Sequence, residues 1–149
     1  MKIVIKPCTI NDVVQSGLLD LYADECQLEG LPRPSADISM YEEMCGFKGL
    51  HVVGAWDNTQ LVGFVTVLTI KIAHYGKTLV TIESIFAHAD YRKFGAGAKL
   101  LRYVEQYARE ANAIGLLISA PAGGKLSSAL KRSKKYRLSN EVFMRGFSE

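Results

Sequence analysis

The sequence lacks the features that mark several classes of protein. It has three cysteines, Cys8, Cys26 and Cys45, which is an odd number without a C-x-x-C pair, so neither a disulfide framework nor a zinc site is indicated. Its three histidines lie far apart and share no metal-ligand spacing. The longest apolar run, 61–70, is far shorter than the roughly 20 residues of a membrane-spanning helix. These absences predict a protein with no metal cofactor and no membrane insertion.

The length and the net charge of the chain are typical of a compact globular protein. A chain of 149 residues is the size of one domain, and we expect a single domain over 1–149. The net charge of +3 is mild, although basic residues gather in 125–137, and it does not by itself indicate nucleic-acid binding. No secretory signal is visible near the start of the chain, so a cytoplasmic location is expected. A homodimer remains an open alternative.

Apolar spacing predicts an α/β (α+β) chain. Spacings of three and four residues predict helices after Thr9–Asp12 as far as Gly30, at 35–44, at 95–111 and at 125–133. Alternation and β-branched residues predict strands at 2–8, 50–56, 60–75, 78–87, 114–119 and 141–147. The strands at 50–56, 60–75 and 78–87 form an antiparallel meander. The strand at 114–119 follows a helix and should therefore run parallel to the strand at 78–87.

The stretch Ile85–Lys99, IFAHADYRKFGAGAK, carries the chemistry. A strand leads through a turn with Gly95 and Gly97 into a strongly periodic helix. The N–H groups of such a helix start have no partners within the helix, and the helix dipole adds positive charge. The pattern therefore predicts an anion site there, suited to a phosphate. The spacing matches neither a G-x-x-x-x-G-K-[ST] loop nor a G-x-G-x-x-G fingerprint, whose last glycine is replaced by Leu100.

The pattern R-x-x-G-x-G, formed by Arg92, Gly95 and Gly97 after an apolar strand, closely resembles the pyrophosphate loop of the GNAT superfamily of N-acetyltransferases. The predicted order of helices and strands is similar to that superfamily over nearly the whole chain. The resemblance implies a mixed central sheet of about six to seven strands flanked by about four helices. It also implies an acyltransferase that uses acetyl-CoA.

The resemblance assigns cofactor contacts to two segments. Backbone N–H groups of the loop would bind the pyrophosphate of coenzyme A. The preceding strand would pair edge-on with the pantetheine arm, and the N–H of Ala87 would polarise the thioester carbonyl. The implied cofactor-binding residues are Ile85, Phe86, Ala87, Arg92, Lys93, Phe94, Gly95, Ala96, Gly97 and Ala98.

Glu83 is the candidate general base. Strict alternation would place Thr81, Glu83, Ile85 and Ala87 on one face of the strand, so that Glu83 would project near the acyl end of the channel. A carboxylate there could take the proton of an amine directly or through water. In related members a glutamate also occurs two residues earlier, where this chain has Thr81. The alternative is a solvated residue or a partner of Lys71 across the sheet.

The general acid is less clearly indicated. Many members of the superfamily carry a tyrosine in the helix after the fifth strand, at the position that corresponds to Lys131 here. Tyr136, Tyr75 and Tyr41 are candidates by residue type, with Tyr136 the one selected. Alternatively there is no dedicated acid, because a thiolate with a pKa near about 8.5 leaves readily.

The acceptor is indicated only by class. In the superfamily, substrate recognition usually involves the segment between the first two helices, which here contains Glu25, Glu29, Asp37, Glu42 and Glu43. Such acids could attract a cationic amine. The leading hypothesis is therefore an acetyl-CoA-dependent N-acetyltransferase acting by direct attack of a primary amine, of a protein or of a small molecule. The alternative is a degenerate member that binds coenzyme A or a partner protein without turnover.

Overall fold

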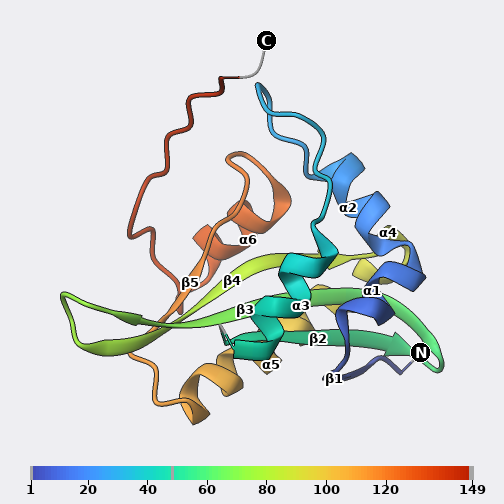
Figure 1. Ribbon diagram of the computed structural model, residues 1–149, viewed down its shortest axis with the longest axis horizontal. Coiled ribbons are helices and arrows are strands. Elements are labelled where there is room, and N and C mark those ends of the chain that lie inside the picture. Colours follow the sequence, from blue (N-terminus) through green and yellow to red (C-terminus); the bar gives the residue numbers. More distant parts are fainter. Residues whose placement is uncertain (1, 48, 148–149) are drawn as a thin grey trace.

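The computed structural model describes residues 2–47 and 49–147, and in these residues one mixed β-sheet has helices on both faces (Figure 1). The strands are β1 (Val4–Pro7), β2 (Leu50–Asp57), β3 (Gln60–Ile72), β4 (Lys77–Ala87) and β5 (Leu116–Ile118). The helices are α1 (Ile10–Ser16), α2 (Leu18–Glu25), α3 (Ile38–Phe47), α4 (Ala89–Arg92), α5 (Ala96–Glu110) and α6 (Lys125–Arg132). The predicted α+β class and mixed sheet are confirmed.

The sheet has the order β1-β2-β3-β4-β5. The first four strands pair antiparallel in sequence order, and β5 lies parallel to β4, as the preceding helix predicted. The β2–β3 hairpin closes through Asn58, whose φ of 54° is a conformation that asparagine tolerates better than most residues. The long β3–β4 pair is the centre of the sheet, and it positions the candidate site.

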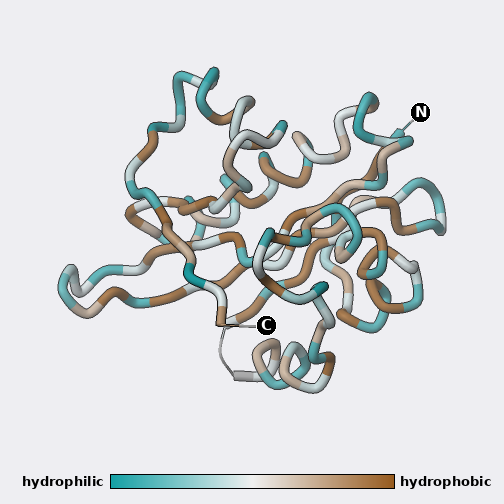
Figure 2. Tube along the Cα trace, turned by 90° about the horizontal axis from the view of Figure 1, so that it is seen from above, coloured by the Kyte–Doolittle hydropathy of each residue, from teal (hydrophilic) through white to brown (hydrophobic). Residues whose placement is uncertain are grey.

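Two hydrophobic clusters cover the two faces of the sheet. On one face, α5 buries Ala96, Leu100 and Val104 against the central strands. On the other face, α1, α2 and α3 pack over a second cluster, which includes Phe64 and Phe86. Figure 2 shows the corresponding hydropathy, with hydrophobic residues concentrated along the strands through the middle of the molecule. None of the helices in 2–47 and 49–147 is long and apolar enough to cross a membrane.

The first predicted helix is two helices. The capping box is present as predicted, because Thr9 Oγ1 accepts from the N–H of Asp12 at 3.1 Å and Asp12 Oδ2 accepts from the N–H of Thr9 at 2.9 Å. The chain then breaks at Gly17, whose φ of 79° ends α1 and begins α2. Glycine adopts this conformation at little steric cost, so the backbone can break here. The apolar spacing in the sequence continues across the break, which is why it predicted one helix. After α2, the α2–α3 loop (residues 26–37) leads to α3.

The predicted final strand at 141–147 is wrong. Among the described residues the sheet has five strands rather than six to seven, and there are six helices rather than about four. A strand needs an edge to pair with, but this segment arches away from the sheet and ends beside the α2–α3 loop (Figure 1), where Met144 lies near Gly30. Its apolar side chains are therefore exposed, with Phe143 at 87% and Phe147 at 82%.

Candidate functional site

A β-bulge interrupts the centre of the sheet at Glu83. Thr66 of β3 pairs with Ser84, and the next residue of β3, Val67, pairs with Ile82, so Glu83 has no opposite residue. An extra residue of this kind bends the strand and shifts its side-chain alternation by one position.

The bulge overturns the predicted side-chain phase of β4. Ile85 and Ala87 pack in the cluster beneath α5, together with Ile82, which precedes the bulge. Glu83 lies on the opposite face with Ser84, so it does not share a face with Ile85 and Ala87 as strict alternation required. The roles predicted for Ile85, Phe86 and Ala87 belong to their main chain and stay predictions, because a main-chain contact does not depend on side-chain phase.

The Glu83 carboxylate accepts hydrogen bonds from three hydroxyl groups. The Tyr41 hydroxyl of α3 donates to it at 2.9 Å, Thr66 Oγ1 of β3 at 2.5 Å, and Ser84 Oγ at 2.9 Å. These donors come from three elements, so the carboxylate is held in one orientation. Lys71, the alternative partner, is paired along the strand with Thr78, away from the bulge.

Burial and the Glu83 charge raise the pKa of the Tyr41 phenol well above its usual value. Burial, with smaller contributions from Cys26 and Glu83, also raises the pKa of Tyr22. Both phenols therefore remain protonated at neutral pH, and Tyr41 can act as a permanent hydrogen-bond donor to Glu83.

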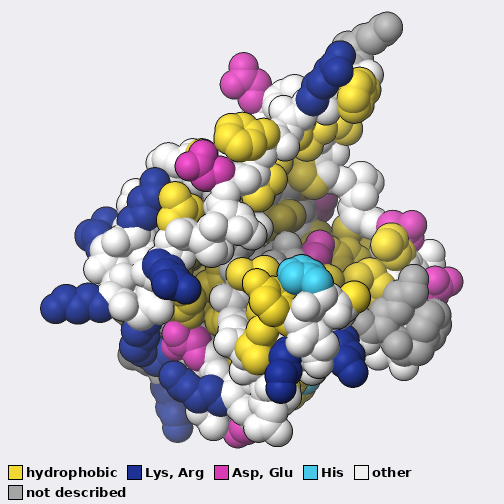
Figure 3. Space-filling model, turned by 90° about the vertical axis from the view of Figure 1, so that its left-hand side faces the viewer, with side chains coloured by type: hydrophobic (Ala, Val, Ile, Leu, Met, Phe, Trp, Pro, Cys, Tyr) yellow, Lys and Arg dark blue, Asp and Glu magenta, His cyan; other side chains and the backbone are white. Residues whose placement is uncertain are grey.

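Glu83 opens onto a pocket of about 370 Å³. Ser84 and Phe64 contribute to its sheet side, Tyr22 and Tyr41 come from α2 and α3, and much of the remaining wall belongs to the α2–α3 loop. Figure 3 shows a hollow on one face of the molecule that is lined largely by hydrophobic side chains, with lysines and arginines gathered to one side of it. In 2–47 and 49–147, no group of three or more His, Cys, Asp or Glu side chains is placed to hold a metal ion.

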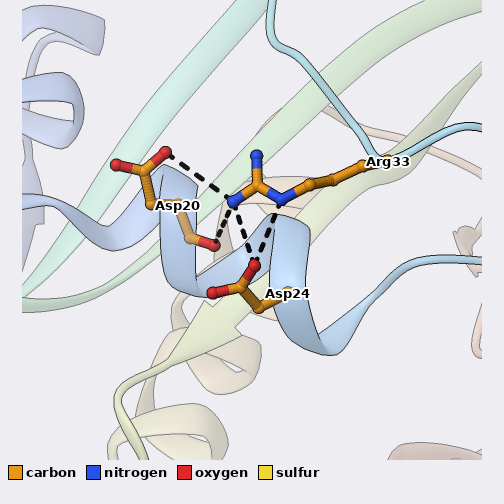
Figure 4. Close-up of polar contacts among 3 residues, drawn as sticks. All are labelled: Asp20, Asp24 and Arg33. Carbon is orange, nitrogen blue, oxygen red and sulfur yellow. Dashed lines mark hydrogen bonds and ion pairs between the residues drawn. The ribbon is translucent and has the colours of Figure 1, made fainter.

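An ion-paired clamp holds the loop that forms this wall (Figure 4). Arg33 donates to Asp24 Oδ1 from Nε at 3.1 Å and from its terminal nitrogen at 3.0 Å, and to the carbonyl oxygen of Asp20 at 3.3 Å. These contacts connect the α2–α3 loop to α2. The ion pairs of the clamp are exposed, so they contribute little to the free energy of unfolding. Their main effect is to fix the position of the loop.

Beyond the bulge, β4 and β5 no longer pair. Their parallel register covers only Val80–Ile82 of β4, although β4 continues to Ala87. On its other side, β4 stays paired with β3 as far as Ala87. One edge of the strand after Glu83 is therefore left without β5, at the place where an extended ligand could pair with the backbone.

The predicted anion loop lies directly after this edge. α5 begins at Ala96. The preceding Gly95 has a φ of 81°, a left-handed conformation that favours glycine, and no side chain caps the helix. The first N–H groups, those of Ala96, Gly97 and Ala98, have no partner within the helix. A Cβ added to Gly97 would meet no atom within 4 Å, so the helix end is open to an approaching group.

Arg92 has a structural task. Its Nε donates to the carbonyl oxygen of Ala87 at 2.8 Å, and its terminal nitrogen donates to Glu25 Oε2 at 2.5 Å. Its guanidinium also lies 5.3 Å from the centre of the Phe86 ring. The side chain therefore connects the loop to the strand end and to α2. The N–H groups of Phe94 and Gly95 donate to the carbonyl oxygens of Tyr91 and Arg92 at 3.1 and 3.0 Å, so these two predicted phosphate donors are already engaged within the loop.

Tyr136 lies outside this cluster. Its hydroxyl donates to Glu105 of α5 at 2.6 Å, and burial and this carboxylate raise its pKa. It does not line the pocket, so its role as an acid is still a prediction without a supporting contact. Tyr41, which the sequence suggested by residue type alone, is the tyrosine that meets Glu83. A contact between residues 42 positions apart has no local signal in the sequence.

Two of the acids expected to form a cationic-amine site have other partners. Glu25 pairs with Arg92, and Asp37 accepts from the N–H of Met40 and from the Ser39 hydroxyl at the start of α3. None of Glu25, Glu29, Asp37, Glu42 and Glu43 lines the pocket beside Glu83.

A mixed sheet whose parallel pairing ends at a bulge, followed by a glycine turn into an uncapped helix, is the arrangement expected for the GNAT fold. The chain matches the Acetyltransferase (GNAT) family over residues 17–122, and it belongs to that family. It is accordingly an acyltransferase.

Solved structures are similar over nearly the whole chain. An aminoglycoside acetyltransferase from an uncultured soil metagenomic sample has a TM-score of 0.74 at 18% identity, covering 99% of this chain and 96% of that one. A ribosomal-protein-alanine N-acetyltransferase from Brucella melitensis biovar Abortus 2308 has a TM-score of 0.72 at 20% identity, with 97% and 100% covered. A transcriptional regulator from Bacillus halodurans C-125 has a TM-score of 0.78 at 18% identity, with 98% and 100% covered. At these low identities the TM-scores show a shared fold and nothing further. No curated protein matches the chain significantly.

Proposed function

We propose that this protein transfers the acetyl group of acetyl-CoA to a primary amine by direct attack, with Glu83 as the general base. The observation that carries the proposal is the position of Glu83. The bulge turns its carboxylate into the pocket at the point where β4 loses β5, so one residue borders both the acceptor pocket and the open strand edge.

The residues that would hold acetyl-CoA fit that group. The uncapped N–H groups of Ala96, Gly97 and Ala98 suit the pyrophosphate, and the open space at Gly97 leaves room for it. The edge of β4 at 85–87, which β5 does not cover, suits the amides of the pantetheine arm, and the carbonyl oxygen of Ala87 already accepts from Arg92 Nε. When bound, acetyl-CoA supplies an activated acetyl thioester.

Glu83 accepts the proton of the amine. An alkylammonium with a pKa near about 10 gives its proton to the carboxylate, directly or through water, and becomes nucleophilic. The amine nitrogen then forms a bond to the acetyl carbon as the carbon–sulfur bond breaks. The thiolate would leave with the electron pair of that bond and take up the proton that the amide nitrogen must still lose, so that the low basicity of the thiolate removes the need for a strong acid. Tyr41 positions Glu83 and does not exchange a proton.

Tyr41→Phe tests this positioning role. A hydrogen bond to a charged group contributes about 1.5–3 kcal/mol, so kcat/KM should fall by roughly tenfold to a hundredfold. In a Glu83→Gln background, the same change should cost less than about threefold, because the carboxylate on which Tyr41 acts is gone. Equal costs in both backgrounds would assign Tyr41 to the fold alone. Tyr75→Phe, at an exposed tyrosine outside the pocket, is the control.

Two measurements test the function itself. Acetyl-CoA at about a hundred times its dissociation constant should stabilise the protein by about 2.7 kcal/mol in thermal unfolding. Release of free thiol from acetyl-CoA in the presence of amines should then show turnover. Stabilisation without thiol release for any amine would favour the alternative, a member that binds coenzyme A without turnover, and no stabilisation would contradict both.

A further inference from the structure

The pocket beside Glu83 has a single charge. Of the described residues that line it, Glu83 alone carries a charged side chain. The remaining polar side chains are the hydroxyls of Ser35, Ser84 and the two tyrosines, and a thiol at Cys26. The apolar members of the wall are Leu19, Leu28, Leu31, Pro32, Pro34, Ala36 and Phe64.

Neighbouring acids do not add charge to this wall. Asp24 and Asp20 face Arg33 on the far side of the loop, and Glu25 is paired with Arg92. An acceptor in the pocket therefore meets one carboxylate and can neutralise one ammonium group there.

A polycationic acceptor is a poor match for these walls. Each further ammonium group placed against leucine and proline would lose hydration without gaining a carboxylate, and an uncompensated charge in apolar surroundings is strongly unfavourable. An apolar substituent in the same place would instead be removed from water, and burial of apolar surface favours binding.

The volume and the aromatic side chains limit the body of the acceptor. About 370 Å³ lies at the small end of the range for ligand pockets. Tyr22 and Phe64 present tilted rings 6.0 Å apart, and Tyr41 stands beside Glu83. Such an arrangement suits one aromatic ring or a short branched alkyl group, packed edge-to-face.

We propose that the acceptor is a small monoamine whose single amino group is attached to an apolar body of about the size of one aromatic ring. This inference rests on the proposed function and specifies its acceptor. The amine meets Glu83, and the body is buried against Phe64 and the α2–α3 loop.

A panel of amines tests the proposal by thiol release at fixed, saturating acetyl-CoA. Methylamine, n-butylamine and phenethylamine form a series of increasing apolar size, and spermidine and sisomicin are the polycations. We expect kcat/KM to rise by roughly fourfold per buried methylene along the series. Phenethylamine should exceed both polycations by at least about tenfold. A preference for spermidine or sisomicin, or no dependence on apolar size, would overturn the proposal.

A peptide with an N-terminal phenylalanine is the last acceptor to be tested in the amine panel. It offers the same amine and ring with a polar chain attached. Its kcat/KM should be at least about tenfold below that of phenethylamine, and the reverse order would overturn the assignment to a small molecule.

Leu28→Asp tests the wall itself. Leu28 lines the pocket and is 47% exposed, so a polar replacement should fold. The new carboxylate should lower kcat/KM for phenethylamine and raise it for spermidine, changing their ratio by at least about tenfold. Leu21→Asp, on α2 and outside the pocket, should leave the ratio unchanged. An unchanged ratio in Leu28→Asp would contradict the proposed wall.

The two levels of the proposal fail differently. If no amine releases thiol and acetyl-CoA does not stabilise the protein, the acetyltransferase proposal fails. If an amine releases thiol but polycations are preferred, only the acceptor assignment fails.

Discussion

Glu83→Gln should lower kcat for amine acetylation by about a hundredfold to ten-thousandfold, the usual contribution of a positioned general base. Glutamine keeps the size of the side chain and an oxygen that can accept from Tyr41 and Thr66, so the bulge and the pocket should be preserved. What is lost is the ability to take a proton. The measurement is thiol release at saturating acetyl-CoA and amine, as a function of pH.

Two readouts separate a loss of chemistry from a loss of structure. Stabilisation by acetyl-CoA should be the same in Glu83→Gln as in the unmodified protein, because the carboxylate is not among the groups proposed to hold the donor. Glu43→Gln, an exposed acid of α3, is the matched control and should retain full activity. If Glu83→Gln keeps its rate within about twofold, another group accepts the proton and the assignment is wrong.

Gly97→Phe should weaken donor binding about a hundredfold while the protein stays folded. A Cβ added at this position meets no atom within 4 Å, and we expect the phenylalanine ring to occupy the open space in front of the first N–H groups of α5. If the dissociation constant for acetyl-CoA rises a hundredfold, the stabilisation of about 2.7 kcal/mol falls to about 0.4 kcal/mol at the same ligand concentration. Thermal unfolding with and without acetyl-CoA gives both numbers.

Gly46→Phe is the control for this substitution. Gly46 also lies in a helix, and a Cβ there also meets no atom within 4 Å, but α3 does not belong to the predicted donor site. Both substitutions replace a helical glycine, which is a poor helix former, so neither should reduce the stability of the free protein by much. Full stabilisation by acetyl-CoA in Gly97→Phe would place the donor elsewhere.

The sequence was sufficient for the order of most elements and for the loop. The β-branched composition of β3 and β4, the periodicity of α5 and the glycine turn before it are local properties, and the parallel β5 follows from its connection through α5. These features are encoded within a few residues of where they appear, which is why a single chain reveals them.

What the sequence did not reveal depends on residues that are distant in the chain. The partnership of Tyr41 with Glu83, and the use of Glu25 by Arg92, arise only when α2 and α3 pack on the sheet. The final strand failed because an apolar, alternating segment forms a strand only beside an available edge, and this segment lies beside the α2–α3 loop instead.

The bulge is visible in the sequence of β4 as a change in the spacing of its apolar residues. Apolar side chains of the cluster under α5 occupy even positions before it, at Val80 and Ile82, and odd positions after it, at Ile85 and Ala87. The shift occurs across the adjacent polar pair Glu83–Ser84. Reading the strand as one continuous alternation concealed this change of phase and misplaced the Glu83 side chain.

The phase shift in β4 also bears on how such a protein can diverge. After the bulge, the proposed donor contacts are made by the main chain, which substitutions leave unchanged, whereas the even-numbered side chains Ser84 and Phe86 face the helices around the proposed acceptor pocket. On the proposed function, mutation of these side chains and of the α2–α3 loop would alter the acceptor while the donor stays the same. The proposed arrangement lets acceptor specificity change during divergence while donor binding is conserved.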